Sequence, residues 1–136
     1  MKNKWYTKQV ISRVKRGGNK GLFAVGEIVL EPAQKITPLD TGELETSGSV
    51  DQDKKNLITY ISFTRMKDGF DVAVEQHENP TYNHLPGKRF KYLQEPFFQL
   101  GPSFLPSVLK DEISKELKWQ ITIFEIRLTF RWKVFI

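Results

Sequence analysis

The chain of 136 residues is 39% hydrophobic and carries a formal net charge of +5, which suits one compact domain that removes roughly two-thirds of its unfolded surface from water. It has no cysteine, which excludes disulfides, thiolate metal sites and thiol nucleophiles. No stretch reaches the roughly 18 uncharged apolar residues of a membrane span, and no apolar segment follows the basic start, so we expect a soluble, unsecreted protein.

The charge is unevenly distributed along the chain. Residues 1–20 hold seven cations and no acid, residues 21–53 hold one lysine and seven acids, and residues 54–136 sum to +4. A basic segment beside an acidic one suits either a polyanionic partner or head-to-tail contact between identical subunits. A solvated basic terminus without any partner is the simpler interpretation.

Two helices are predicted in the first third of the chain. Apolar residues at helical spacing over residues 5–16 indicate a short helix, and the glycine-rich residues 16–21 that follow indicate a hinge. From Leu22 to Ile36 the apolar residues recur every three or four positions, which predicts a long helix. Pro38 should end it, because the residue before a proline is disfavoured in the α region.

A third, short helix is predicted after this proline. Asp40 can act as its N-cap with Glu43 three residues later, and Leu39 and Leu44 have the spacing of a hydrophobic staple. Gly48 is placed to stop the helix.

The middle of the chain predicts a β-hairpin and a loop. Residues 57–66 and 70–77 are β-branched and aromatic runs, and residues 67–69 between them have turn chemistry. Residues 78–87 contain two prolines and few core residues, so we expect a long loop of functional or mobile character.

The last third predicts a helix and a long strand. Leucine and isoleucine recur every four residues from Leu105 to Leu117, after an interruption near Gly101-Pro102. From Phe124 to the end, apolar and polar residues alternate, which predicts a strand over residues 119–136. A strand this long should bend, pair with a neighbouring subunit or remain an exposed edge.

The fold class that these elements predict is α+β: a small antiparallel sheet packed against a long helix and a C-terminal helix, with a long C-terminal β-strand. We expect a single domain over residues 1–136. Within it, residues 1–20 form a basic N-terminal arm or short helix, residues 21–118 the core and residues 119–136 the C-terminal strand.

Residue patterns that carry chemistry are weak throughout. His77 and His84 lack the helical i,i+4 spacing of a metal motif. The glycines of residues 17–21 follow no strand and precede no Gly-Lys-Ser/Thr, so a hinge explains them better than a phosphate cradle. No serine lies in a nucleophile elbow, and the paired acids suit a solvated surface. We therefore expect no enzyme, no cofactor and no metal.

The loop over residues 75–92 and the C-terminal strand mix aromatic and cationic side chains. Such residues form protein interfaces and also bind single-stranded nucleic acid, while a third interpretation makes the aromatics core and the cations solvated. The candidate subunit or partner contacts are His77, Tyr82, His84, Lys88, Arg89, Arg127, Arg131 and Lys133.

Two segments carry a family resemblance. The first is Ile36-Thr-Pro-Leu-Asp-Thr-Gly-Glu-Leu-Glu-Thr-Ser-Gly48, and the second joins Val72-Ala-Val-Glu-Gln-His-Glu-Asn79 to Lys91-Tyr-Leu-Gln-Glu-Pro-Phe97. In this order, and preceded by a long helix, they resemble the minor capsid and tail-completion (head-tail joining, neck) proteins of tailed bacteriophages. The basic N-terminal region and the C-terminal strand lie outside the resemblance.

The resemblance implies a structural virion protein without catalytic residues. Its subunits would form a homo-oligomeric ring, 6- or 12-fold, between the head connector or stopper and the tail terminator or tail tube proteins. It would assemble in the host cytoplasm, reside in the virion neck and contact packaged DNA non-specifically, with no membrane partner. The implied fold-corner residues are Pro38, Asp40, Thr41, Gly42, Leu44 and Ser47, and the implied loop edges are Gln76, His77, Glu78, Lys91, Tyr92, Leu93 and Pro96.

Two other functions stay open. A nucleic-acid-binding module would use the basic N-terminal arm and the aromatic and cationic loop over residues 77–92, with binding that weakens steeply as salt rises. A small hydrolase or nuclease would need a cluster of reactive residues, and the sequence offers none.

Overall fold

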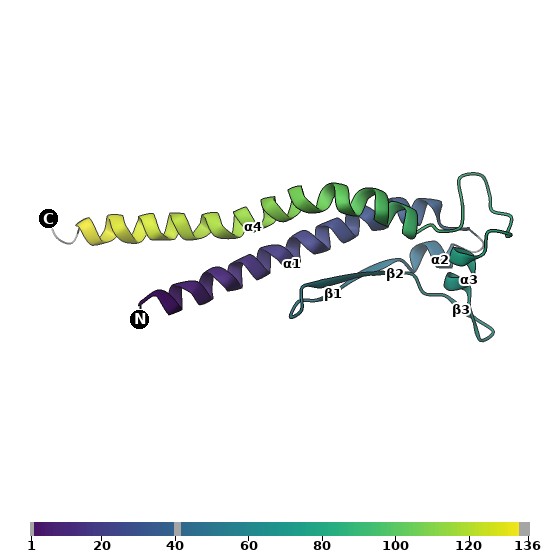
Figure 1. Ribbon diagram of the computed structural model, residues 1–136, viewed down its shortest axis with the longest axis horizontal. Helices are drawn as coiled ribbons and strands as arrows, with labels where there is room; N and C mark the ends of the chain where they lie inside the picture. Colours follow the sequence, from purple (N-terminus) through teal and green to yellow (C-terminus); the bar gives the residue numbers. More distant parts are fainter. Residues whose placement is uncertain (1, 40–41, 134–136) are drawn as a thin grey trace.

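The computed structural model describes the backbone of residues 2–39 and 42–133, and the side chains of residues 7–39 and 42–118. Two long helices and a small hairpin run side by side along an elongated molecule, with α1 between α4 and the β1–β2 hairpin (Figure 1). The chain exposes 10242 Å², whereas a compact chain of 15.9 kDa exposes roughly 7,400 Å². The elements are α1 (Lys2–Ile36), α2 (Glu43–Thr46), β1 (Ser49–Asp53), β2 (Ile58–Ser62), β3 (Met66–Lys67), β4 (Phe70–Asp71), α3 (Val72–Glu78) and α4 (Gln94–Lys133).

Helix α1 is a single helix of 35 residues, so the predicted hinge at residues 16–21 is wrong. The glycines there make room for α4: a Cβ added at Gly17 would lie 2.6 Å from the Cα atom of Ile113, and one at Gly21 would lie 3.2 Å from the Cα atom of Leu109. Close packing of two helix backbones outweighs the low helix propensity of glycine. The predicted end of the helix before Pro38 is confirmed.

Helix α4 is also longer than predicted. Neither Gly101 nor Pro102 interrupts it, and it continues to Lys133, so the predicted long C-terminal β-strand is not found among residues 119–133, while residues 134–136 lie outside the described residues. Alternating apolar residues also fall at i,i+4, the spacing of one helix face, and elongating an existing helix adds one hydrogen bond per residue. A strand would need a partner strand, whereas a helix satisfies its backbone hydrogen bonds within itself.

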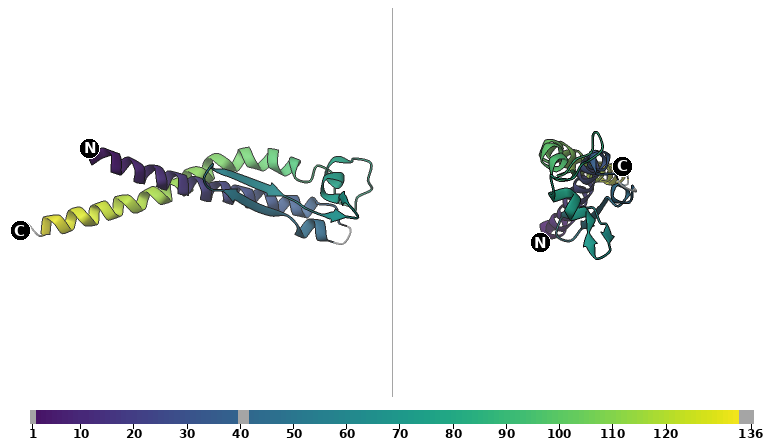
Figure 2. Two further views of the ribbon diagram at one scale, coloured as in Figure 1. Left: turned by 90° about the horizontal axis from the view of Figure 1, so that it is seen from below. Right: turned by 90° about the vertical axis from the view of Figure 1, so that its right-hand side faces the viewer.

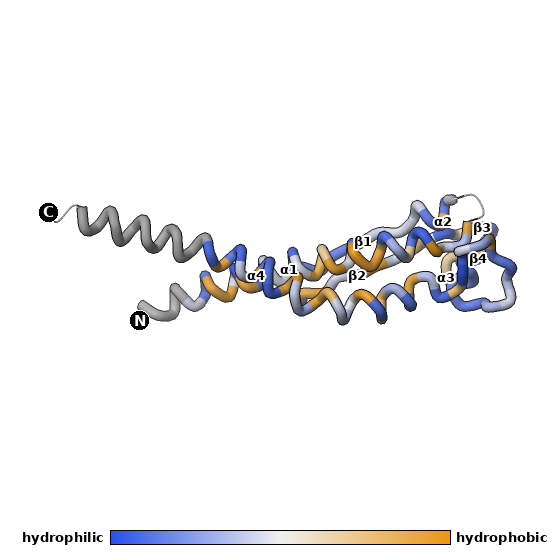
Figure 3. Tube along the Cα trace, turned by 90° about the horizontal axis from the view of Figure 1, so that it is seen from above, coloured by the Kyte–Doolittle hydropathy of each residue, from blue (hydrophilic) through white to orange (hydrophobic). Residues whose placement is uncertain are grey.

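Strands β1 and β2 pair antiparallel, with Ser49 opposite Ser62 and Asp53 opposite Ile58. Strand β2 lies within the predicted run of residues 57–66, but its partner β1 was not predicted. Val50 of β1 packs so closely on α1 that a Cβ added at Gly26 would lie 2.7 Å from its Cγ1 atom. Apolar segments of α1 lie along the middle of the molecule beside β1 and β2, whereas the loop between α3 and α4 is largely hydrophilic (Figure 3).

The second hairpin confirms the predicted turn and shortens the predicted strands. Strands β3 and β4 have two residues each, and Asp68 and Gly69 between them both have positive φ, as a two-residue hairpin turn requires. The predicted strand over residues 70–77 is wrong beyond Asp71, because α3 begins there. The Asp71 carboxylate accepts hydrogen bonds from the backbone N–H groups of Ala73 and Val74, which is the geometry of an N-cap.

The short helix after Pro38 is confirmed as α2, with a different N-cap from the predicted one. Gly42 is the N-cap, with φ of 79° and no side-chain cap bond, while the predicted cap Asp40 and its neighbour Thr41 lie outside the described residues. Leu44 of α2 is buried. It forms a core cluster with Ala73 and Tyr92, joining the corner after α1 to α3 and to the start of α4.

Candidate interaction surfaces

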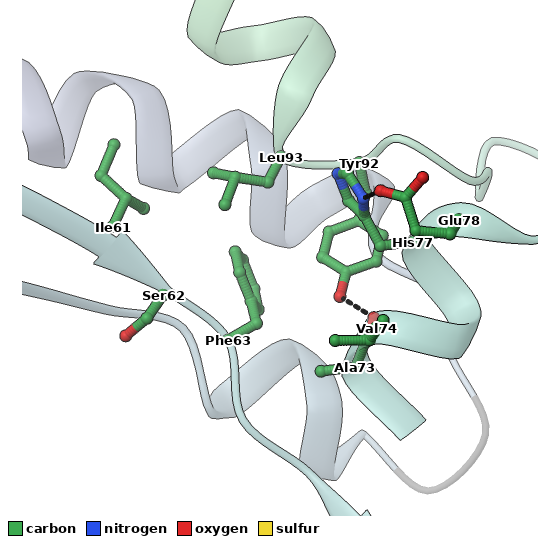
Figure 4. Close-up of a pocket in the computed structure, with 9 residues that line it drawn as sticks. All are labelled: Ile61, Ser62, Phe63, Ala73, Val74, His77, Glu78, Tyr92 and Leu93. Carbon is green, nitrogen blue, oxygen red and sulfur yellow. Dashed lines mark hydrogen bonds and ion pairs between the residues drawn. The ribbon is translucent and has the colours of Figure 1, made fainter. Parts of the chain in front are cut away.

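The predicted loop edges meet around Tyr92. Its ring lies edge-on to the rings of Phe63 and His77, with centroids 5.1 and 5.0 Å apart. Its hydroxyl donates to the backbone carbonyl of Ala73 (2.9 Å). Around these rings lies a mostly apolar pocket of about 270 Å³ (Figure 4), lined by Ile61, Ser62, Phe63, Ala73, Val74, His77, Glu78, Tyr92 and Leu93.

Glu78, one of the residues that line this pocket, links His77 to Lys91. The Glu78 carboxylate lies 2.6 Å from Nδ1 of His77 and also pairs with the Lys91 ammonium group. The hydrogen bonds from Lys91 and then from His77 lower the pKa of Glu78. Nε2 of His77 lies 3.4 Å from the backbone nitrogen of Gln94. His77 of α3 therefore contacts two groups. One is Glu78, which pairs with Lys91, and the other is the backbone of Gln94 at the start of α4.

Ser62 and His77 both line this pocket but lie apart within it. The Ser62 side chain points away from His77 (Figure 4), and its hydroxyl lies 3.2 Å from that of Ser49. Within the part of the chain that the structure describes, no three His, Cys, Asp or Glu residues are placed to hold a metal ion. His77 is best explained as a positioning residue that packs on Tyr92.

The predicted cations of the loop are occupied internally. Lys88 pairs with Glu45 (3.0 Å) and Arg89 with Glu95 (3.1 Å). A phosphate would have to displace a carboxylate from each of them. The side chains of the other predicted contacts, Arg127, Arg131 and Lys133, lie outside the described residues, although their backbones belong to α4.

The two remaining predicted contacts lie apart from the Tyr92 pocket. Tyr82 is exposed, and its hydroxyl is 3.4 Å from the Glu75 carboxylate. His84 lines a separate groove of about 510 Å³ together with Arg65 and Leu44. Its Nε2 atom is buried and has no hydrogen-bond partner among the residues described. The structure thus brings His77 together with Lys91 and Tyr92 but does not gather the whole predicted set.

Three of the seven cations of the basic N-terminal arm bind to α4. Lys20 and Arg16 lie 2.6 and 3.5 Å from the Glu116 carboxylate, and Arg13 donates to the Glu116 backbone carbonyl. The Glu116 side chain is only 11% exposed, and the hydrogen bond from Lys20 is the main cause that lowers its pKa. These cations stabilise the helix pair and are not fully free for a polyanion.

Exposed apolar side chains are the surface feature that sequence reasoning missed. Among the side chains described, sixteen large hydrophobic ones are exposed, whereas seven hydrophobic residues are buried. Phe70 (74%) and Met66 (66%) project from the β3–β4 hairpin, and Phe98 (64%) and Phe97 stack edge-on along α4. Bulky apolar residues beside the predicted turn at residues 67–69 were the available signal, because a hairpin this short cannot bury them.

In the described part of the chain, no helix is long and apolar enough to span a membrane. Comparison of the chain with protein-family models, with curated proteins and with solved structures finds no match.

Proposed function

We propose that this protein is a structural subunit of a bacteriophage neck, which forms a ring between the head connector and the tail. The observation that carries the proposal is the excess of exposed over buried large apolar side chains in an elongated chain. Monomeric proteins rarely leave extended apolar patches in water, whereas surfaces that bury in an assembly contain them. The sequence resemblance over residues 22–97 to neck proteins of tailed bacteriophages indicates which kind of assembly this is.

The pairing of charges supports a scaffold rather than a reaction centre. The loop cations Lys88, Arg89 and Lys91 each hold a carboxylate from a different element, which fixes the loop to α2, α3 and α4. Such a fixed loop gives a rigid surface with a low entropic cost of ordering on assembly. His77 also helps to fix the loop, because its ring contacts Glu78 and the backbone nitrogen of Gln94.

Co-assembly tests this proposal. The purified chain would be mixed with the connector and tail proteins of the phage that encodes it, and imaged by negative-stain electron microscopy beside native mass measurement. We expect ring-shaped particles and a mass that is a multiple of the subunit mass. Dispersed monomers in every mixture would contradict the proposal.

A nucleic-acid-binding module is the second candidate. The observation in its favour is that Lys8, Lys15, Lys54 and Lys55 are exposed and pair with no carboxylate in the described part of the chain. Filter binding of single-stranded and duplex DNA over a salt series would test it, because phosphate contacts weaken steeply with salt. No binding at low salt would rule it out.

A further inference from the structure

A groove runs beside strand β2, on the side that faces away from β1. It consists of the Tyr92 pocket and a second pocket of about 340 Å³, which adjoin at Ile61 because that residue lines both. The second pocket is lined by residues of α1, β2 and α4 and by none of β1. We call the two pockets together the β2 groove. Figure 2 shows the hairpin and the two long helices that surround it.

Apolar residues form the floor and the far wall of the β2 groove. Val25 and Val29 of α1 are buried at its floor. On α4, Phe97, Gly101 and Leu105 line it at a spacing of four residues, which places them on one helix face. Phe97 is 49% exposed, so the groove leaves a large aromatic side chain half in water.

Strand β2 brings open backbone groups to the same groove. In an antiparallel pair, every second residue of a strand points its N–H and C=O groups away from the partner strand. Among the residues described, β2 makes backbone hydrogen bonds to β1 and to no other element. Its outward-pointing groups therefore form an open strand edge along the groove, which another extended chain can pair with.

The charges of the lining favour an uncharged occupant with its own backbone. No lysine or arginine lines either pocket, and the one carboxylate, Glu78, is paired with Lys91. A phosphate or a lipid headgroup would find no cation there, and an acyl chain has no donors for the strand edge. The open edge of β1 in a second copy also fits poorly, because β1 carries Asp51 and Asp53 beside a single apolar residue, Val50.

We infer that the β2 groove binds an extended segment of a partner protein, which adds to β2 as a third strand. Its backbone pairs with the open edge, and its alternate side chains are apolar and point toward α1 and α4. Thr59 of β2 shows that direction, because its Cγ2 atom lies 3.2 Å from a Cβ added at Gly26 of α1. This site goes beyond the proposed neck role, since it requires neither a ring nor a connector.

Synthetic peptides test strand addition on the full chain. The probes are peptides of about eight residues that alternate valine, leucine or phenylalanine with threonine, and the same peptides with a central proline. We expect the alternating peptides to bind in isothermal titration calorimetry and the proline peptides to bind at least about tenfold more weakly, because proline removes a backbone donor. Bound peptide should also slow amide hydrogen exchange within β2. Equal binding of both sets, or no binding by any of these peptides, would overturn the inference.

Two substitutions at one glycine locate the peptide. A Cβ added at Gly101 meets nothing within 4 Å, so Gly101→Leu can extend into the groove without disturbing the helix. We expect Gly101→Leu to weaken peptide binding by at least about tenfold, whereas the matched control Gly101→Ala retains it, with circular dichroism confirming that both chains are folded. Peptide binding that Gly101→Leu leaves unchanged would place the peptide elsewhere and contradict the site.

The other occupants give different results in the same experiments. Binding of sodium laurate that Gly101→Leu abolishes, without binding of any peptide, would identify an acyl-chain site and overturn strand addition. Self-association in analytical ultracentrifugation that Gly101→Leu abolishes, again without peptide binding, would identify a second copy and overturn the partner segment. Neither experiment uses connector or tail proteins, so a negative result here leaves the neck proposal standing, and a failure to form rings leaves this site standing.

Discussion

The Tyr92 hydroxyl donates a 2.9 Å hydrogen bond to the backbone carbonyl of Ala73, across a separation of 19 residues. Both residues are buried, so this bond joins the start of α4 to the first turn of α3 away from water. The long loop between them is thereby closed at its base. The core cluster of this end of the molecule is built around that bond.

Removing the hydroxyl should destabilise the fold. We expect Tyr92→Phe to lower the free energy of unfolding by about 0.5–1.5 kcal/mol, because the buried hydrogen bond to the Ala73 carbonyl would be lost. Urea denaturation followed by circular dichroism would measure the change. Tyr60→Phe is the matched control, since Tyr60 is exposed on β2 and should change stability by less than about 0.5 kcal/mol.

Alkaline pH should weaken the same link. Burial, and to a smaller extent the charge of Asp71, raises the pKa of Tyr92 from 10.0 to about 12. Between these two values the unfolded chain has released the phenolic proton while the folded chain retains it, so stability falls as the pH rises through this window. The stability difference between the wild type and Tyr92→Phe should therefore shrink between pH 10 and about pH 12, and a constant difference would contradict the assignment.

The same substitution at two helical glycines should have opposite effects. Gly17→Ala would place a Cβ 2.6 Å from the backbone of α4 and should destabilise the protein by about 1–3 kcal/mol through overpacking. Gly101→Ala places its Cβ more than 4 Å from any neighbour and should stabilise α4 by about 0.5–1 kcal/mol. Thermal denaturation of both variants would check the signs, and a stabilised Gly17→Ala would contradict the close helix seam.

Acid should release the cross-helix ion pairs at Glu116. Because its pKa is lowered from 4.5 in the folded chain, the pairs contribute stability above that value, and the contribution is lost as the pH falls through the lower, folded pKa. We expect Glu116→Gln to be less stable than the wild type near neutral pH and equally stable in acid. Glu31→Gln, which removes an exposed pair with Lys35 on one helix face, should change stability little at either pH, and an equal loss in both variants would contradict the special role of Glu116.

Local patterns predicted the elements whose signals are short in range. The apolar stripe from Leu22 to Ile36, the stop before Pro38 and the turn at residues 67–69 each depend on a few neighbouring residues, and each is found in the structure. The α+β class with a long helix, a small antiparallel sheet and a C-terminal helix followed from the same patterns. The meeting of His77, Lys91 and Tyr92 was only implied, through the sequence resemblance.

The tertiary structure alone decided how the two long helices continue and which surfaces remain open. Glycines 17 and 21 indicate a hinge when read alone, but they are helical because a second helix backbone packs against them. The alternating residues near the C-terminus fit a strand as well as a helix face, and they continue the helix α4 that begins at Gln94. Exposure is likewise mostly a property of the whole fold: Met66 and Phe70 flank a predicted turn, but no such local pattern marks the other exposed apolar side chains.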